Sequence, residues 1–265
     1  MYCAGAHVWS SWGSNGRYLK HDFLEYIFIY TRQKTPWYNF NSLLKIFLTA
    51  TTNQMIKILP QKLNRLYQRA CYPFSPTELK RKAIFIHIPK AAGTSVRVAL
   101  GESARGRLHI PWWVYEQASP RKFKEFYKFA FVRNPLDRTF SGYNYLKTGG
   151  NQMEDLVVSQ QIKKYSCFNE FVEAELISGK MIYHPIFRTQ TCYLCNWKGE
   201  IKVDFVGKFE NIDFDFKAVA AQLKITNTNI LQKLNQSKEA KETVEENTKK
   251  IIRELYKDDY DIFGY

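Results

Sequence analysis

The sequence has no long hydrophobic run. No stretch of its 265 residues approaches the roughly 18 uninterrupted apolar residues that a membrane-spanning helix requires. The first twenty residues, MYCAGAHVWSSWGSNGRYLK, also lack the compact apolar core of a signal peptide. We therefore expect a cytoplasmic protein with neither a signal peptide nor a transmembrane helix.

Cysteine is scarce, and its number is odd. The five cysteines are irregularly spaced: Cys3, Cys71, Cys167, Cys192 and Cys195. An odd, irregular set argues against a disulfide framework and for reduced thiols. Cys192 and Cys195 form one CxxC pair, but no second pair lies nearby, so two buried thiols are favoured over a zinc or redox site.

Hydrophobic residues make up 45% of the chain and aromatic residues 16%, enough for one full core and too many for a disordered chain. The net charge is +14 and is unevenly distributed. Residues 1–82 carry 12 basic and 3 acidic side chains (12 − 3 = +9), and residues 83–265 carry 27 and 22 (27 − 22 = +5). This excess favours an anionic partner, and a nucleic acid, an acidic lipid surface, an acidic glycan or a nucleotide would each satisfy it. The alternative is a solvated, solubilising face.

The composition changes near residue 80, which predicts a boundary between a basic extension (1–82) and a main domain (83–265). In the extension, Asn41 and Ser42 are suited to cap a helix that Pro60 interrupts, and apolar residues recur at helical spacing between them. Such a helix could lie on a membrane surface, giving the protein a peripheral membrane contact. We favour a helical extension packed on the main domain.

Strands alternate with helices from residue 83 onward. Short β-rich runs at 83–88, 129–132 and 203–206 are each followed by a predicted helix, at 95–100, 136–147 and 214–223, and a last helix is predicted at 239–256. This order predicts an α/β protein in which helices flank both faces of a central parallel sheet, as in a P-loop-like three-layer fold.

The stretch FIHIPKAAGTSVRVAL, residues 85–100, predicts an anion site. A buried strand ends at Ile88, Lys90 follows, and Gly93, Thr94 and Ser95 open a helix, so backbone N–H groups, hydroxyls and an ammonium converge. The alternative is a tight strand-to-helix turn with an ordinary glycine and cap. In a nucleotide-triphosphatase loop the lysine follows the second glycine, whereas here it precedes Gly93.

A second stretch, FAFVRNPLDRTFSGY, residues 129–143, predicts a second anion site. Arg133 stands at the end of a strand, Pro135 begins a helix, and Ser141 lies about two turns into that helix. A guanidinium and a hydroxyl could then converge on a phosphate. The alternative is that Arg133 only pairs with Asp137.

Together the two stretches resemble the 5′-phosphosulfate and 3′-phosphate motifs of sulfotransferases, with Pro-Lys-x-x-Gly-Thr-Ser followed by Arg-x-Pro-x-x-Arg-x-x-Ser-x-Tyr. Arg138 and Tyr143 fall in register with the second motif. Four further stretches are similar to the carbohydrate sulfotransferase family: His184–Gln190, Asp204–Asn211, Leu234–Lys238 and Asp261–Tyr265. The resemblance runs from Ala83 to Tyr265 and leaves out the first 80 residues, which also lack the membrane anchor of the Golgi members.

The resemblance implies transfer of a sulfuryl group from 3′-phosphoadenosine 5′-phosphosulfate (PAPS) to a carbohydrate or glycolipid hydroxyl, without a metal. The product from the donor would be adenosine 3′,5′-bisphosphate. No nucleic-acid partner is expected. Lys90 would neutralise the leaving phosphate. The donor-binding residues would be Lys90, Ala92, Gly93, Thr94 and Ser95 at the 5′-phosphate, Arg133 and Ser141 at the 3′-phosphate, and Ser237 and Lys238 closing over the nucleotide.

His109 is our candidate for the base that takes the acceptor proton. It lies between the two motifs, where the resemblance to the glycan sulfotransferases implies a histidine base, and an imidazole ordinarily titrates near neutral pH. The alternatives are a surface histidine at 109 or a base elsewhere: His87, His184, Glu102 or Glu116. Trp112, Trp113 and Tyr115 could stack on a sugar or belong to the core.

Two other functions fit the residues. A P-loop kinase would share the fold and the anion loop, and a non-catalytic binder of nucleic acid or acidic glycan would use the basic extension. The sequence predicts neither the acceptor nor the oligomeric state.

Overall fold

The computed structural model describes residues 71–103, 109–150, 153, 155–178, 181–225 and 242–265. From Tyr72 onward the chain forms one compact unit. The predicted helices of the basic extension lie outside the described residues. The boundary at residue 83 therefore stays a prediction.

In the described part of the chain, three parallel strands form the sheet, in the order β1-β2-β3. They are β1 (Ala83–Ile86), β2 (Tyr127–Val132) and β3 (Phe205–Lys208), and they confirm the predicted α/β architecture. In the register, Phe85 pairs with Phe129, which pairs with Phe205. The first strand ends two residues earlier than predicted, and the third begins two residues later than predicted.

Helices make up most of the remaining structure. The α-helices are α6 (Pro76–Arg81), α7 (Gly93–Ala99), α8 (Trp112–Ala118), α9 (Pro120–Glu125), α10 (Pro135–Lys147), α11 (Asp155–Ile162), α12 (Phe168–Phe171), α13 (Thr191–Leu194), α14 (Ile212–Gln222), α15 (Glu246–Leu255) and α16 (Lys257–Phe263). A π-helical turn, η1 (Val172–Leu176), extends α12, and the 3₁₀ turns are η2 (Met181–Tyr183) and η3 (Phe209–Asn211).

The last long helix begins later than the sequence predicts. Residues 242–245 are not helical, and α15 starts at Glu246. Asn169 explains the difference, because its side chain donates to the carbonyl of Thr243 and accepts from the backbone N–H of Glu245. These tertiary hydrogen bonds hold the segment in an extended path that helix propensity does not anticipate.

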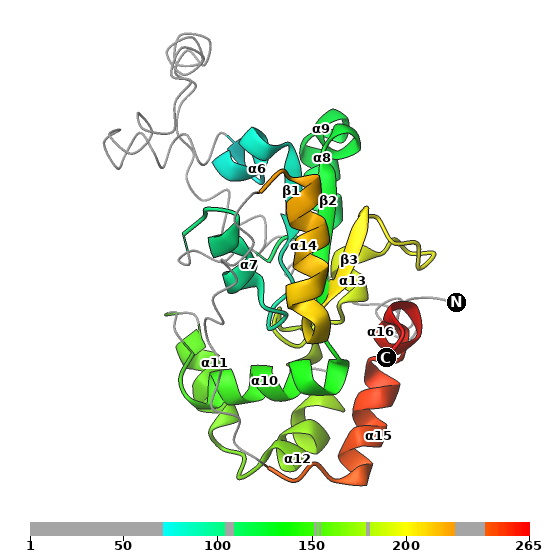
Figure 1. Cartoon of the computed structure of the whole chain (residues 1–265). Coiled ribbons are helices and arrows are strands. Elements are labelled where there is room, and N and C mark those ends of the chain that lie inside the picture. The colour runs from blue at the N-terminus through cyan, green and yellow to red at the C-terminus, as the bar shows by residue number, and fades with distance from the viewer. Residues whose placement is uncertain (1–70, 104–108, 151–152, 154, 179–180, 226–241) are drawn as a thin grey trace, which may run out of the picture. The chain divides into compact units, whose positions relative to one another are not determined.

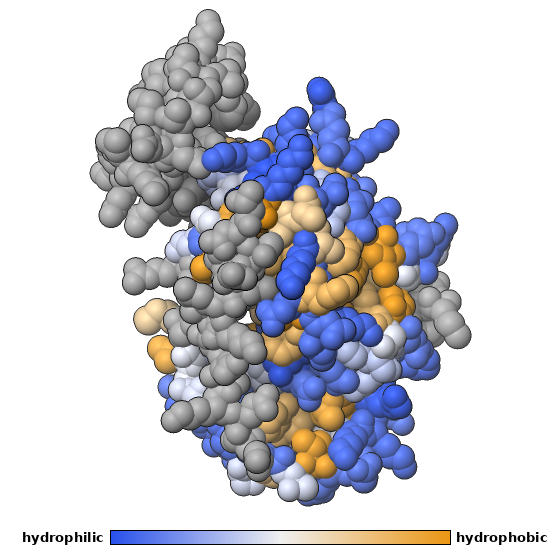
Figure 2. Space-filling model, viewed as in Figure 1, coloured by the Kyte–Doolittle hydropathy of each residue, from blue (hydrophilic) through white to orange (hydrophobic). Residues whose placement is uncertain are grey.

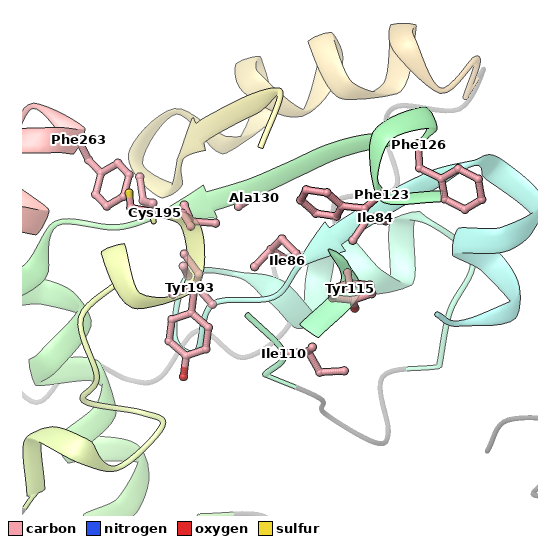
Figure 3. Packing of buried hydrophobic residues seen from close by; sticks show 14 of the residues in the cluster. Ile84, Ile86, Ile110, Tyr115, Phe123, Phe126, Ala130, Tyr193, Cys195 and Phe263 are labelled. Carbon is pink, nitrogen blue, oxygen red and sulfur yellow. The ribbon is translucent and has the colours of Figure 1, made fainter. Parts of the chain in front are cut away.

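The two faces of the sheet bury different side chains, as the alternation of a strand requires. Ala83, Phe85, Phe129 and Phe131 pack with α7 and α14 on one face. The opposite face carries Ile84, Ile86, Ala130 and Val132, which pack with side chains of α6, α8, α9, α13 and α16. Figure 3 shows this second core, in which Tyr115, Phe123, Tyr193 and Phe263 gather on the face that carries Ile84, Ile86 and Ala130. The sheet is thus covered on both faces.

A third core lies among α10, α11, α12, η1 and α15. Its buried side chains include Tyr143, Phe168, Phe171 and Ile252. Helix α10 leaves β2 directly and extends across the end of the sheet beside this core (Figure 1). It therefore joins the sheet to the second half of the domain.

The face of the molecule that Figure 2 shows carries both polar and apolar residues. Figure 2 shows hydrophilic residues over much of this face, with apolar residues gathered around α14. Phe214 of that helix is 76% exposed. Within the described ranges, no helix has the length and apolar character needed to cross a membrane.

Candidate functional site

The loop that follows β1 has an unusual backbone. Ile88 is buried in the core beneath the loop, whereas Lys90 and Ala92 take left-handed conformations with φ of 66° and 60°. The left-handed conformation costs a residue with a Cβ about 1–2 kcal/mol of conformational free energy. The surrounding structure must therefore hold Lys90 and Ala92 in a backbone conformation that these residues would not adopt on their own. Backbone N–H groups in such left-handed turns line anion-binding concavities. The anion site at this loop stays a prediction, and the left-handed backbone is compatible with it.

Gly93 opens α7 directly against the imidazole of His87. A Cβ at Gly93 would overlap Cδ2 and Nε2 of that ring, so no larger residue fits while His87 stays in place. His87 is 6% exposed and stacks on Phe85, with ring centroids 5.7 Å apart. The glycine of the loop is therefore required by a neighbouring side chain, a reason that the sequence motif does not reveal.

His109 also contacts His87. The two ring centroids are 4.6 Å apart, and Nδ1 of His109 is 3.1 Å from the backbone oxygen of His87. Because a carbonyl oxygen can only accept, Nδ1 is the donor in this contact. In a neutral imidazole with that tautomer, Nε2 is the nitrogen that can accept a proton. Ile110 anchors the histidine, since its side chain is buried in the core of Figure 3.

The second predicted motif begins where β2 ends. Gln190 holds the backbone of Arg133 at both ends, because its amide accepts from the N–H at 2.9 Å and donates to the carbonyl at 2.9 Å. Asn134 caps α10 through hydrogen bonds from the backbone N–H groups of Leu136 and Asp137. The guanidinium carbon of Arg133 lies 4.3 Å from the centroid of the Phe209 ring.

Arg138, the second arginine of this motif, is fully buried. Its guanidinium donates to the carbonyls of Ile186 and Arg188. Asp259, also fully buried, accepts from the backbone N–H groups of Gln190 and Thr191. Burial raises the pKa of the Asp259 carboxyl, while the Arg138 charge acts in the opposite direction. Arg138 and Asp259 thus fix the segment that carries Gln190, and through it Arg133.

The sheet places both motifs at the carboxyl ends of its strands. Strands β1 and β2 are parallel neighbours, so the loop with Lys90 and the segment with Arg133 leave the same carboxyl end. Thr94 is half-buried and Ser95 buried in the first turn of α7, and Ser141 is 7% exposed on α10. Ser237 and Lys238 lie outside the described residues.

The other candidate bases have different surroundings. Glu102 accepts from Arg97 Nε at 2.8 Å and from the hydroxyl of Ser75. Glu116 is half-buried on α8. Burial lowers the pKa of His184, which lines a pocket of about 460 Å³ with Tyr165, Glu175 and Met181 among others.

Two of the aromatic residues considered for sugar stacking belong to the core. Tyr115 is 5% exposed and donates to Glu78, and Trp112 donates its indole N–H to the carbonyl of Cys195. The cysteines at 71, 167, 192 and 195 form no disulfide with one another in the described part of the chain. Cys195 is buried as predicted, but Cys192 is exposed.

Residues 106–265 match a family described as the sulfotransferase family, and this match covers more than half of the chain. It includes Arg133, Ser141 and His109, and it begins after the loop of Lys90, which it does not cover. Comparisons with curated proteins and with solved structures found no match. The chain belongs to the sulfotransferase family.

Proposed function

We propose that this enzyme moves a sulfuryl group from PAPS to a hydroxyl of a carbohydrate acceptor, on a glycan or a glycolipid. The observation that carries the proposal is the position of the two motifs, which leave the carboxyl ends of the adjacent parallel strands β1 and β2. In open α/β sheets, ligands such as nucleotides bind outside the carboxyl ends of the strands. Membership of the sulfotransferase family supports sulfuryl transfer as the reaction.

The donor would be recognised at its two phosphate ends. The left-handed loop, Thr94 and Ser95 are suited to hold the 5′-phosphosulfate, because they combine backbone N–H groups with hydroxyls. Arg133 and Ser141 are suited to the 3′-phosphate. Gln190 fixes the backbone of Arg133, which limits the positions that its guanidinium can take. A 3′-phosphate site would let the enzyme distinguish PAPS from ATP, which has no 3′-phosphate.

The transfer would proceed in line. A bond forms between the acceptor oxygen and sulfur while the bond from sulfur to the oxygen of the 5′-phosphate breaks, and adenosine 3′,5′-bisphosphate leaves. The acceptor proton passes to Nε2 of His109, whose Nδ1–H is held by the carbonyl of His87. The ammonium of Lys90 neutralises the charge that develops on the leaving phosphate.

Calorimetry on the full chain tests donor recognition. We expect adenosine 3′,5′-bisphosphate to bind at least tenfold more tightly than ATP or adenosine 5′-phosphosulfate, neither of which has a 3′-phosphate. Equal affinity for all three, or no binding, would overturn the proposal. Tight binding of ATP with magnesium would favour a kinase.

A transfer assay with radiolabelled PAPS tests the reaction. A panel of polysaccharides and glycolipids serves as acceptors, and the product is identified by mass and linkage. We expect Lys90→Ala to abolish transfer. A non-catalytic anion binder would show no transfer, and its affinity for an acidic polymer would fall steeply with salt and survive Lys90→Ala.

A further inference from the structure

The ammonium of Lys90 lies over an aromatic ring that neither motif includes. Its Nζ is 4.3 Å from the centroid of the Tyr145 ring, well inside the distance at which a cation is attracted to a ring face. Tyr145 belongs to α10 and stands four residues after Ser141, so the two side chains share one face of that helix. This face therefore links the loop after β1 with the helix after β2.

The ring of Tyr145 is itself held at its far end. Its hydroxyl donates to the carboxylate of Asp155, the first residue of α11. Gly150 closes the end of α10, because its N–H bonds to the carbonyl of Tyr145 at 2.9 Å. Gly150 has φ of +66°, and a Cβ there would overlap the Asp155 side chain. Gly150 thus lies directly against the Asp155 side chain, on the same segment that bonds to Tyr145.

We propose that Tyr145 is a positioning residue that holds the Lys90 ammonium in place through its ring face, with Asp155 fixing the ring. This inference rests on the proposed function, in which Lys90 meets the 5′-phosphate of the donor. A lysine side chain has many rotamers, and binding a phosphate must restrict them. A ring that already restricts the ammonium reduces the conformational entropy that the lysine loses when it binds the phosphate. The left-handed backbone at Lys90 directs the side chain but leaves its four-carbon stem free to rotate.

The test measures the affinity of the full chain for adenosine 3′,5′-bisphosphate by calorimetry. Tyr145→Leu removes the ring, and we expect affinity to fall about 3- to 20-fold, the range of a partly exposed cation–ring contact. Tyr145→Phe keeps the ring and loses only the bond to Asp155, so its loss should be smaller. Phe140→Leu is the matched control, because it removes a ring of the same helix that packs on Phe168. Its affinity should match that of the wild type.

The double variant Lys90→Ala/Tyr145→Leu separates positioning from a general structural role. If Tyr145 acts through Lys90, the double variant binds no more weakly than Lys90→Ala alone. Additive losses, or a Tyr145→Leu variant with wild-type affinity, would overturn the inference and leave the proposed function standing. A wild-type chain that does not bind the bisphosphate would overturn both.

A second pair of variants keeps the inference testable if Tyr145→Leu does not fold. Asp155→Ala should weaken binding in the wild-type background and have no further effect in Tyr145→Phe, which lacks the hydroxyl. An equal effect in both backgrounds would show that Asp155 does not act through the tyrosine and would overturn this part of the proposal.

Discussion

The imidazole of His87 occupies the space that a Cβ of Gly93 would need. The same imidazole lies 4.6 Å from the ring of His109, measured between centroids. A residue of the proposed phosphate loop and the proposed base thus both contact one buried histidine. The geometry of the loop and the position of the base therefore depend on each other.

Gly93→Ala tests this dependence. The new methyl group must displace the His87 ring, and overpacking of this kind costs about 1–3 kcal/mol of unfolding free energy. Thermal or denaturant unfolding measures the loss. We expect His87→Ala in the same chain to restore part of it, because the ring is then gone. A Gly93→Ala variant as stable as the wild type would show that the loop moves aside freely.

The sequence predicts the sheet and the position of both motifs because these depend on local patterns. Apolar runs followed by helical periodicity identified all three strands and the helices after them. The arrangement at Gly93 was not predictable in the same way. Strand alternation assigns a face to His87, but it does not reveal that the ring lies against the start of α7.

The support of Arg133 was missed for a different reason. Gln190 is 57 residues away from Arg133 along the chain, and Asp259 is 69 residues from Gln190. No periodicity connects such positions. The signal that was present is the stretch His184–Gln190, which resembles the family without indicating what its last residue does. Tyr145 gave no signal, since an aromatic residue on a helix is commonly part of a core.

Arg133→Lys tests recognition of the 3′-phosphate. Lysine keeps the charge but cannot form two parallel hydrogen bonds with a phosphate. We expect affinity for adenosine 3′,5′-bisphosphate to fall about tenfold, while the weaker affinity for adenosine 5′-phosphosulfate stays unchanged. Calorimetry with both ligands gives the comparison. A similar loss for both ligands would mean that Arg133 does not face the 3′-phosphate.

His109→Ala tests the base. General base catalysis contributes about 10²–10⁴-fold, so turnover in the transfer assay should fall by that factor while affinity for adenosine 3′,5′-bisphosphate stays within twofold. Glu116→Gln serves as the comparison, since Glu116 is a candidate base on the neighbouring helix α8. If Glu116→Gln loses turnover and His109→Ala keeps it, the carboxylate takes the place of the histidine in the mechanism.

The buried carboxyl of Glu78 should make the unfolding free energy depend on pH. Its carboxyl is buried between α6 and β1, accepting from the N–H of Phe85 and the hydroxyl of Tyr115, and desolvation by burial raises its pKa to about 8. The nearby Glu102 carboxylate also raises this pKa, whereas the hydrogen bonds lower it. The folded chain therefore keeps a proton that the unfolded chain releases above its ordinary pKa of 4.5.

Between pH 5 and pH 8 the unfolded state binds fewer protons than the folded state, so the unfolding free energy should fall as pH rises, by about 1 kcal/mol per pH unit. Denaturant unfolding at several pH values measures this slope. Glu78→Gln removes the titrating group and should flatten it. Glu125→Gln is the control, because Glu125 forms an exposed pair with Arg121 and should leave the slope unchanged. An unaltered slope in Glu78→Gln would assign the pH dependence to other groups.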